Sequence, residues 1–354
     1  MSLYLRKRNQ PQDSFTIHRI ISIMFEGKKI LITGGTGSLG TALTKRLLKT
    51  NVETIRIFSR DELKQGQMES SLNDKRLRFL IGDIRDKDRL SRALEDINIV
   101  IHAAALKHVP IVEYNPFEAV KTNVQGAQNL IDACLDKKVE FALAVGTDKA
   151  VAPLNTYGAT KLLMERLFVS ANYYKGSRNI IFSCVRYGNV LGSRGSVVPK
   201  FIEQIKSGKK LTITDPDMTR FNITMNQALD LILRVLKNGF GGDVFIPKLK
   251  AYRVGDIKDV ICELLDYNKG TERIPIRPGE KLHESLISKH EIRNTYENPD
   301  NDYVIFDDPS GLNRTIPNTT RTTLTDEYAS DKIEVLSRNE LKEILKNENL
   351  IPTT

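Results

Sequence analysis

The segment Lys29–Gly40 reads KILITGGTGSLG and joins an apolar burst to a glycine-rich turn. The apolar residues are typical of a buried strand, and a helix-like pattern follows the turn. Gly34, Gly37 and Gly40 have the spacing G-x-x-G-x-x-G. Glycines in a strand-to-helix turn let backbone N–H groups approach a pyrophosphate, and the helix N-terminus adds a partial positive charge. The segment therefore predicts a dinucleotide-binding loop in a first βα unit.

Strand and helix patterns alternate after this loop. We expect strands at 29–33, 54–59, 77–81, 97–103, 141–145 and 180–186, and helices at 39–49, 117–137 and 157–174. This rhythm predicts an α/β fold with a Rossmann-type, doubly wound parallel sheet. From Gly188 onward, glycines and prolines break the chain into short pieces, which indicates a smaller C-terminal substrate-binding lobe. Residues 310–323 are typical of a loop, and Ser337 is a plausible N-cap for a short helix over 337–346.

These patterns predict a division of the chain into four parts. They are a basic N-terminal extension (1–25), a Rossmann domain (26–190, joined by parts of 220–250), a mainly substrate-binding lobe (191–345) and a tail (346–354). The extension contains a short apolar stretch, interrupted by His18 and Arg19, without the small-residue cleavage site of a signal peptide. We expect a surface extension or an arm of an oligomer there.

Composition narrows the functional classes. The 354 residues have a net charge of +9 and 40% hydrophobic residues, as expected for a globular protein with a large core. We find no basic block with interleaved aromatics, so we expect a polyanionic small substrate and no nucleic acid. Cys134, Cys184 and Cys262 lack disulfide or metal spacing, which favours a reduced, cytoplasmic protein without a metal. No apolar run approaches the roughly 20 residues of a membrane span.

The end of the second predicted strand indicates which cofactor binds. Enzymes that use NAD usually place an acidic residue there for the ribose 2′-hydroxyl. This chain has Ser59 and Arg60 at that point, with Lys64 one turn into the next helix. A hydroxyl and two cations suit a 2′-phosphate, which favours NADP. Asp83 and Ile84 follow the third strand, where an adenine edge is commonly held, although Asp83 is equally suited to capping the next helix.

Two short motifs carry candidate catalytic residues. Tyr157 and Lys161 form Y-x-x-x-K, a spacing that places both side chains on one helical face. A nearby ammonium favours tyrosinate, so the phenol can accept a proton near neutral pH. Thr147, Asp148 and Lys149 precede them at a predicted strand end, where open α/β sheets bind ligands. An acid and a base there indicate proton chemistry beyond simple hydride transfer.

Together these motifs resemble the extended short-chain dehydrogenase/reductase family over about Phe25 to Leu345. Within that family they are most similar to the configuration-inverting UDP-N-acetylglucosamine 4,6-dehydratases of pseudaminic acid and related bacterial sugar pathways. Besides the glycine loop and the two catalytic motifs, the resemblance rests on SRDELKQ (59–65), HAAALKHVP (102–110), RYGNV (186–190), GSRGSV (192–197), MTRF (218–221) and RPGEKLHE (277–284).

The resemblance implies a net loss of water with a tightly bound, recycled NADP. Tyr157 would take the 4-hydroxyl proton of the sugar, and Lys149 would take the C5 proton. Asp148 would protonate the leaving 6-hydroxyl, Thr147 would bond a substrate hydroxyl, and Lys161 would hold the nicotinamide ribose. Retaining relatives have Asp-Glu where this chain has Asp148-Lys149, so the lysine favours inversion at C5. Which group returns the C5 proton stays open.

The resemblance also implies two sets of binding residues. The cofactor set, beyond those named above, is Gly35, Thr36, Ser38, Leu39, Ala103, Ala104, Ala105 and Val190. The substrate set is Lys107, Thr147, Asn189, Arg194, Val197, Thr212, Arg277 and Glu280. UDP-N-acetylglucosamine is the expected substrate, although the nucleotide base stays open, and family members commonly form dimers or hexamers.

Two departures from the family pattern lie beside the predicted chemistry. Ala152-Pro153 replaces the usual Asn-Pro, and Gly146 replaces a Ser or Thr. A nucleotide-sugar epimerase or 4-reductase of the same fold is the first alternative, and it predicts no use for Asp148 and Lys149. A non-catalytic NADP-binding regulator is the second, although such proteins tend to lose the Tyr and Lys that this chain has.

Overall fold

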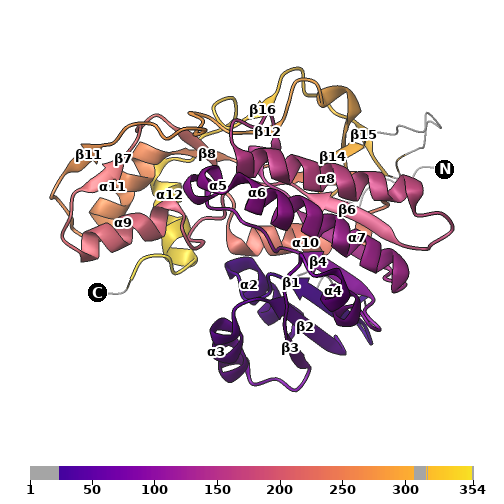
Figure 1. Cartoon of the computed structure of the whole chain (residues 1–354). Helices are drawn as coiled ribbons and strands as arrows, with labels where there is room; N and C mark the ends of the chain where they lie inside the picture. The colour runs from indigo at the N-terminus through magenta and orange to yellow at the C-terminus, as the bar shows by residue number, and fades with distance from the viewer. Residues whose placement is uncertain (1–23, 307–315, 317, 353–354) are drawn as a thin grey trace, which may run out of the picture.

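The computed structural model describes residues 24–306, 316 and 318–352. Most of the predicted N-terminal extension and part of the 310–323 loop lie outside the described residues. A large sheet with helices on both sides forms one body of the molecule, and a smaller lobe with α9, α11 and α12 lies beside it (Figure 1).

Seven parallel strands form the main part of the sheet, in the order β3-β2-β1-β4-β5-β6-β9. Their bounds are β1 (Lys29–Thr33), β2 (Thr54–Ser59), β3 (Leu77–Ile81), β4 (Ile99–His102), β5 (Phe141–Val145), β6 (Ile181–Val185) and β9 (Asp243–Pro247). All four residues of β4 are buried, as a strand covered on both faces requires. The predicted parallel α/β sheet is confirmed.

Three antiparallel strands continue this sheet beyond β9. They are β14 (Asp302–Phe306), β13 (Thr295–Glu297) and β15 (Thr320–Arg321). The sequence-based division had placed this part of 191–345 mainly in the lobe, and β15 lies inside the predicted loop. The local sequence pattern did not predict these strands, because β14 is defined by its register with β9, a pairing between segments far apart in sequence.

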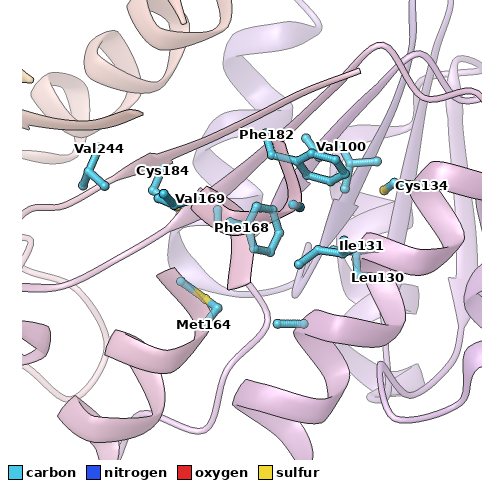
Figure 2. Close-up of a cluster of buried hydrophobic side chains, with 14 of the residues drawn as sticks. Val100, Leu130, Ile131, Cys134, Met164, Phe168, Val169, Phe182, Cys184 and Val244 are labelled. Carbon is cyan, nitrogen blue, oxygen red and sulfur yellow. The ribbon is translucent and has the colours of Figure 1, made fainter. Parts of the chain in front are cut away.

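Helices cover both faces of the sheet. One layer contains α2 (Ser38–Leu47), α3 (Glu62–Leu72) and α10 (Met225–Asn238), and the other contains α4 (Lys87–Ala93), α7 (Gly126–Asp136) and α8 (Thr156–Tyr174). Successive strand residues point to opposite faces, so Leu31 joins one apolar cluster while Ile30 and Ile32 join the other. Figure 2 shows the α7–α8 side, where Phe168 and Phe182 meet.

The predicted helix over 117–137 is interrupted. The structure has α5 (Val109–Tyr114), α6 (Pro116–Ala119), a π-helical segment η1 (Val120–Gln125) and then α7. Within η1, the Asn123 side chain accepts from Leu106 N (2.8 Å) and donates to Leu106 O (2.9 Å). These bonds tie the helix to the loop after β4, a tertiary requirement that helical periodicity does not report.

The lobe and the segments that join it to the large sheet contain the remaining elements. They are η2 (Asp148–Ala150) at its border, α9 (Val197–Lys206), β7 (Leu211–Ile213), β8 (Thr219–Phe221), β10 (Ala251–Arg253), α11 (Val254–Leu264), β11 (Thr271–Arg273), β12 (Ser285–Ile287), η3 (Ile292–Asn294), β16 (Tyr328–Ala329) and α12 (Arg338–Asn347). Phe201, Ile257 and Leu341 form part of its core. Ser337 caps α12 through a capping box with Glu340, which confirms the predicted cap. Among the helices described, none has the length and apolar character needed to cross a membrane.

Candidate active site

The glycine loop between β1 and α2 is closely packed against the loop that follows β4. Gly34 has φ +66°, and a Cβ atom on it would lie 2.8 Å from Ala104 N. A Cβ atom on Gly40 would lie 2.5 Å from Gly35 O. Both positions therefore exclude a side chain. The loop fits the close backbone approach that a pyrophosphate group needs.

A first cavity of about 650 Å³ opens over this loop. The predicted cofactor residues that line it are Gly34, Thr36, Gly37, Ser38, Leu39, Gly40, Ser59, Arg60, Lys64, Asp83, Ile84, Ala103, Ala104, Ala105, Tyr157, Lys161 and Val190. Gly35 is the exception, because it packs on β2, where an added Cβ would lie 2.7 Å from the Ile57 side chain. Gly35 is therefore required for packing and does not line the cavity.

Charged side chains surround the far end of the first cavity. Arg60 lies 3.6 Å from Asp83, and Arg85 binds the same carboxylate at 2.7 Å. Partial burial raises the pKa of Asp83, but hydrogen bonds from Arg85 outweigh this and leave the pKa below its usual value. Lys64 Nζ lies 2.5 Å from Asp61 Oδ2. The Arg60 side chain is 55% exposed, so its guanidinium can offer donors to an incoming anion.

Tyr157 and Lys161 lie in the first two turns of α8, which Asn155 caps through Gly158 N (2.8 Å). Lys161 Nζ donates to Val145 O at 2.5 Å, and burial lowers the pKa of Lys161 to about 8. Burial raises the pKa of Tyr157, while Lys149 and a hydrogen bond with Thr147 act to lower it. Together these effects leave the pKa of Tyr157 above its usual value, and the cation that acts against the rise is Lys149, whereas the sequence pattern had indicated Lys161.

Lys149 lies at the centre of a buried charge cluster. Its Nζ is 3.0 Å from Asp148 Oδ1, 3.0 Å from Glu284 Oε1 and 3.3 Å from Asn189 Oδ1. Burial acts to lower the pKa of Lys149, but the two carboxylates outweigh it and raise the pKa above its ordinary value. Lys149 is therefore an ammonium in this arrangement. Asp148 is fully buried behind it and lines neither this cavity nor the next.

A second cavity of about 320 Å³ continues from the first into the lobe. All predicted substrate residues line it: Lys107, Thr147, Asn189, Arg194, Val197, Thr212, Arg277 and Glu280. The residues common to both cavities are Lys107, Thr147, Tyr157, Asn189 and Ser193. The predicted catalytic tyrosine and threonine thus lie where the two cavities meet.

Arg194 contacts the glycine loop more closely than its predicted role requires. Its Nη2 donates to Thr36 O at 2.7 Å, and its Nε donates to Ser38 Oγ at 3.2 Å. Lys107 Nζ in turn donates to Arg194 O at 3.4 Å. Arg194 therefore lines the second cavity while it bonds the glycine loop beneath the first.

Among the residues of the second cavity that sequence reasoning missed are Lys200, Arg220, Tyr252 and Glu284. Arg220 and Glu284 stand in the MTRF and RPGEKLHE motifs, but spacing alone gave neither a role. Their contacts join segments distant in the chain, such as Arg220 Nη2 with Lys281 O at 3.0 Å. Only the folded arrangement shows that Arg220 and Glu284 act on Lys149.

The model of a polysaccharide biosynthesis protein family matches residues 30–305. An inverting UDP-N-acetylglucosamine 4,6-dehydratase of Campylobacter jejuni is 50% identical, covering 77% of this chain and 81% of its own. A UDP-glucose 4-epimerase of Rickettsia prowazekii is 40% identical, covering 91% and 96%. An uncharacterized membrane protein of Methanocaldococcus jannaschii is 48% identical, covering 92% and 97%.

Solved structures show the same architecture. Pen from Bacillus thuringiensis superposes with a TM-score of 0.87 and 42% identity, covering 92% of this chain and 99% of Pen. A UDP-glucuronic acid 4-epimerase from Bacillus cereus, solved with UDP-glucuronic acid and NAD, has a TM-score of 0.65 and 26% identity, covering 72% and 88%.

Proposed function

Because this chain belongs to the polysaccharide biosynthesis family of extended short-chain dehydrogenases/reductases, and is thus a nucleotide-sugar-modifying enzyme, we propose that it is a configuration-inverting 4,6-dehydratase. The proposed reaction converts UDP-N-acetylglucosamine into the 4-keto-6-deoxy sugar with inversion at C5, for nonulosonic or deoxyamino sugar synthesis. The observation that carries the proposal is Lys149, an ammonium held beside the junction of two cavities by Asp148 and Glu284.

The cofactor proposed for the first cavity is NADP. The glycine cradle fits a dinucleotide pyrophosphate, and Arg60 with Ser59 suits a 2′-phosphate. When bound, the cofactor supplies reversible hydride acceptance, so the net reaction consumes no reductant. The role proposed for Lys161, which lines this cavity, is to bond a ribose hydroxyl of the cofactor.

The second cavity suits a nucleotide diphosphate sugar. Arg277 and Lys200 line it and supply cations for a diphosphate, for which arginine is well suited. The Arg277 N–H donates to Glu280 Oε2 at 3.4 Å, and this carboxylate can accept bonds from ribose hydroxyls. The sugar would then lie at the shared wall formed by Thr147, Tyr157 and Asn189.

The side chains at this junction divide the proton transfers. Tyr157 accepts the 4-hydroxyl proton, helped by Lys149 and by the Thr147 hydroxyl. Lys149 first passes a proton to the Asp148 carboxylate, 3.0 Å away, so that its neutral amine can accept the C5 proton. The C5–H bond then breaks, its proton goes to this amine, and its electron pair forms the C5–C6 double bond. The C6–O bond breaks as the hydroxyl leaves as water with a proton from the Asp148–Lys149 pair. Because Asp148 lines neither cavity, its proton reaches the sugar through Lys149.

The test is mass spectrometry of purified enzyme incubated with UDP-N-acetylglucosamine and no added reductant. We expect the product to have lost one water, and Lys149→Met to abolish this loss while the cofactor stays bound. Lys332→Met is the matched control, because Lys332 is also held by two carboxylates, at 2.8 and 3.0 Å, but on the surface. No loss of water with the wild-type enzyme would refute the dehydratase assignment, and full dehydration by Lys149→Met would refute the role given to Lys149.

A 4-epimerase is the second candidate, favoured by the identity to the Rickettsia enzyme over 91% of this chain. Epimerisation at C4 needs a tyrosine base but no proton transfer at C5. The same incubation separates the two functions, because an epimerase changes the sugar's configuration without changing its mass. An epimerase would also keep its activity in Lys149→Met.

A further inference from the structure

We propose that Glu284 is a positioning residue for Lys149, holding its amine at the sugar-facing side of the junction from within the substrate lobe. This inference rests on the proposed dehydration, in which Lys149 handles the C5 proton. Glu284 lies immediately before β12 and is 2% exposed. Its Oε1 is 3.0 Å from Lys149 Nζ, and its Oε2 has no hydrogen-bond partner among the described residues.

The backbone of Glu284 is fixed on both sides by one serine. Glu284 N donates to Ser330 Oγ at 3.0 Å, and Ser330 N donates to Glu284 O at 2.8 Å. Ser330 Oγ also bonds Thr219 Oγ1 at 2.7 Å, and Thr219 lies in β8, which pairs with β10 in a separate small sheet. The carboxylate is therefore held by a network of the lobe and has little freedom to follow Lys149 if the amine moves.

The three acceptors around Lys149 come from three directions. An ammonium has three N–H donors. Asp148, Glu284 and Asn189 each offer one oxygen within 3.3 Å of Nζ, so all three donors are used. Of the two carboxylates, Glu284 lines the substrate cavity and Asp148 does not. Glu284 thus holds the amine toward the sugar, while Asp148 supports it from behind.

The charges that face Lys149 make the loss of one carboxylate consequential. Burial acts to lower the pKa of Lys149, and Asp148 and Glu284 raise it, while Arg220 acts in the same direction as burial. Lys107, Tyr157 and Tyr252 complete the ionisable groups that interact with it. Without Glu284, Asp148 alone would oppose both burial and Arg220, so the pKa of Lys149 would fall.

The first test is the pH profile of Glu284→Gln, which keeps the side-chain shape and removes the charge. We expect kcat to fall by about tenfold or more with KM changed less than about twofold, because the residue acts on the reacting step. We expect the limb of the kcat–pH profile that reports ionisation of Lys149 to move to lower pH by about one to three units. Glu284→Asp should recover part of kcat and return the limb toward that of the wild type.

The second test reads the amine without turnover. Competitive acetylation followed by peptide mass spectrometry gives the reactivity of Lys149 relative to the exposed Lys49. Lys149 is 18% exposed in the side chain, so the reagent can reach it from the cavity. In Glu284→Gln we expect this ratio to rise about tenfold or more near pH 8, because each unit of lowered pKa gives tenfold more free amine.

Glu327→Gln is the matched control, since Glu327 contacts the surface Lys332 at 3.0 Å and lies outside both cavities. Neither its pH profile nor its Lys149 labelling should change. Unchanged pH limbs and unchanged labelling in a folded Glu284→Gln would overturn the inference. If the wild type dehydrates no nucleotide sugar, the proposed function fails, while the labelling result still decides the role of Glu284.

Discussion

Replacing Arg186 with methionine should destabilise the protein strongly. The guanidinium is 1% exposed and bonds Glu165 through Nε (3.0 Å) and Nη2 (2.5 Å). It also bonds Glu291 at 2.9 and 3.2 Å and Leu286 O at 2.9 Å. Arg186 follows β6, whereas Glu291 and Leu286 belong to the later chain, so these bonds connect the large sheet to segments that border the lobe.

The magnitude depends on what is left behind. Glu165 is 2% exposed and would become an unpaired buried carboxylate, while Glu291 would keep its bonds from Ser288 N and Oγ, both at 2.9 Å. Removing one partner of a buried ion pair costs about 3–5 kcal/mol. We therefore expect Arg186→Met to lower the free energy of unfolding by about that amount. Urea denaturation followed by circular dichroism measures the change.

Two further variants test whether an unpaired Glu165 carboxylate causes the loss of stability. Adding Glu165→Gln to Arg186→Met should recover part of the loss, because no buried charge then remains unpaired. Arg338→Met is the matched control, since Arg338 also bonds two carboxylates, at 3.1 and 2.7 Å, but on the surface. The unpaired Glu165 charge is not the cause if Arg186→Met lowers the free energy of unfolding as little as Arg338→Met does. The same conclusion follows if the double variant recovers none of the lost free energy.

Two more predictions concern the cofactor and pH. Arg60→Ala should weaken NADP binding by about tenfold or more and change NAD binding little, since one charge-assisted bond is worth about 1.5–3 kcal/mol; equal losses for both dinucleotides in fluorescence titrations would contradict this. Burial raises the pKa of Asp243 to about 6 from 3.8. Because the folded pKa is the higher one, Asp243 lowers stability progressively as pH rises from about 4 to about 6, by about 3 kcal/mol. Asp243→Asn removes this pH-dependent contribution. The free energy of unfolding of the variant in urea, relative to the wild type, should therefore rise between about pH 4 and about pH 6. Parallel curves of unfolding free energy against pH for the two proteins would contradict the prediction.

The parallel sheet could be predicted because its strands carry local signals. The apolar runs of β1 and β4 are buried on both faces, and the bounds predicted for β2, β3 and β5 agree with the structure. The antiparallel β13–β15 extension could not be predicted, because short strands of this kind are selected by pairing with β9 and with each other. The π-helical segment was likewise missed, because its cause is a contact with another loop.

The candidate site divides in the same way. Tyr157, Lys161 and Lys149 were identified because the motif spacing and the strand end place them together locally. Glu284 stands 135 positions after Lys149 in the sequence and reaches it only through the fold of the lobe. The burial of Asp148 is also a tertiary property, and it changes the proposed proton path because the carboxylate does not face the sugar.

The π-helical segment η1 changes the direction in which side chains leave one continuous helical stretch of chain. Within η1, Asn123 is directed at the loop after β4, where its amide binds Leu106 and Thr160. After it, Leu130 and Ile131 are directed into the core beneath the sheet. A uniform α-helix advances about 100° per residue, so removing the extra residue would turn one of these faces away from its partner. The wider turn thus lets a single stretch of chain serve both the active-site loop and the hydrophobic core.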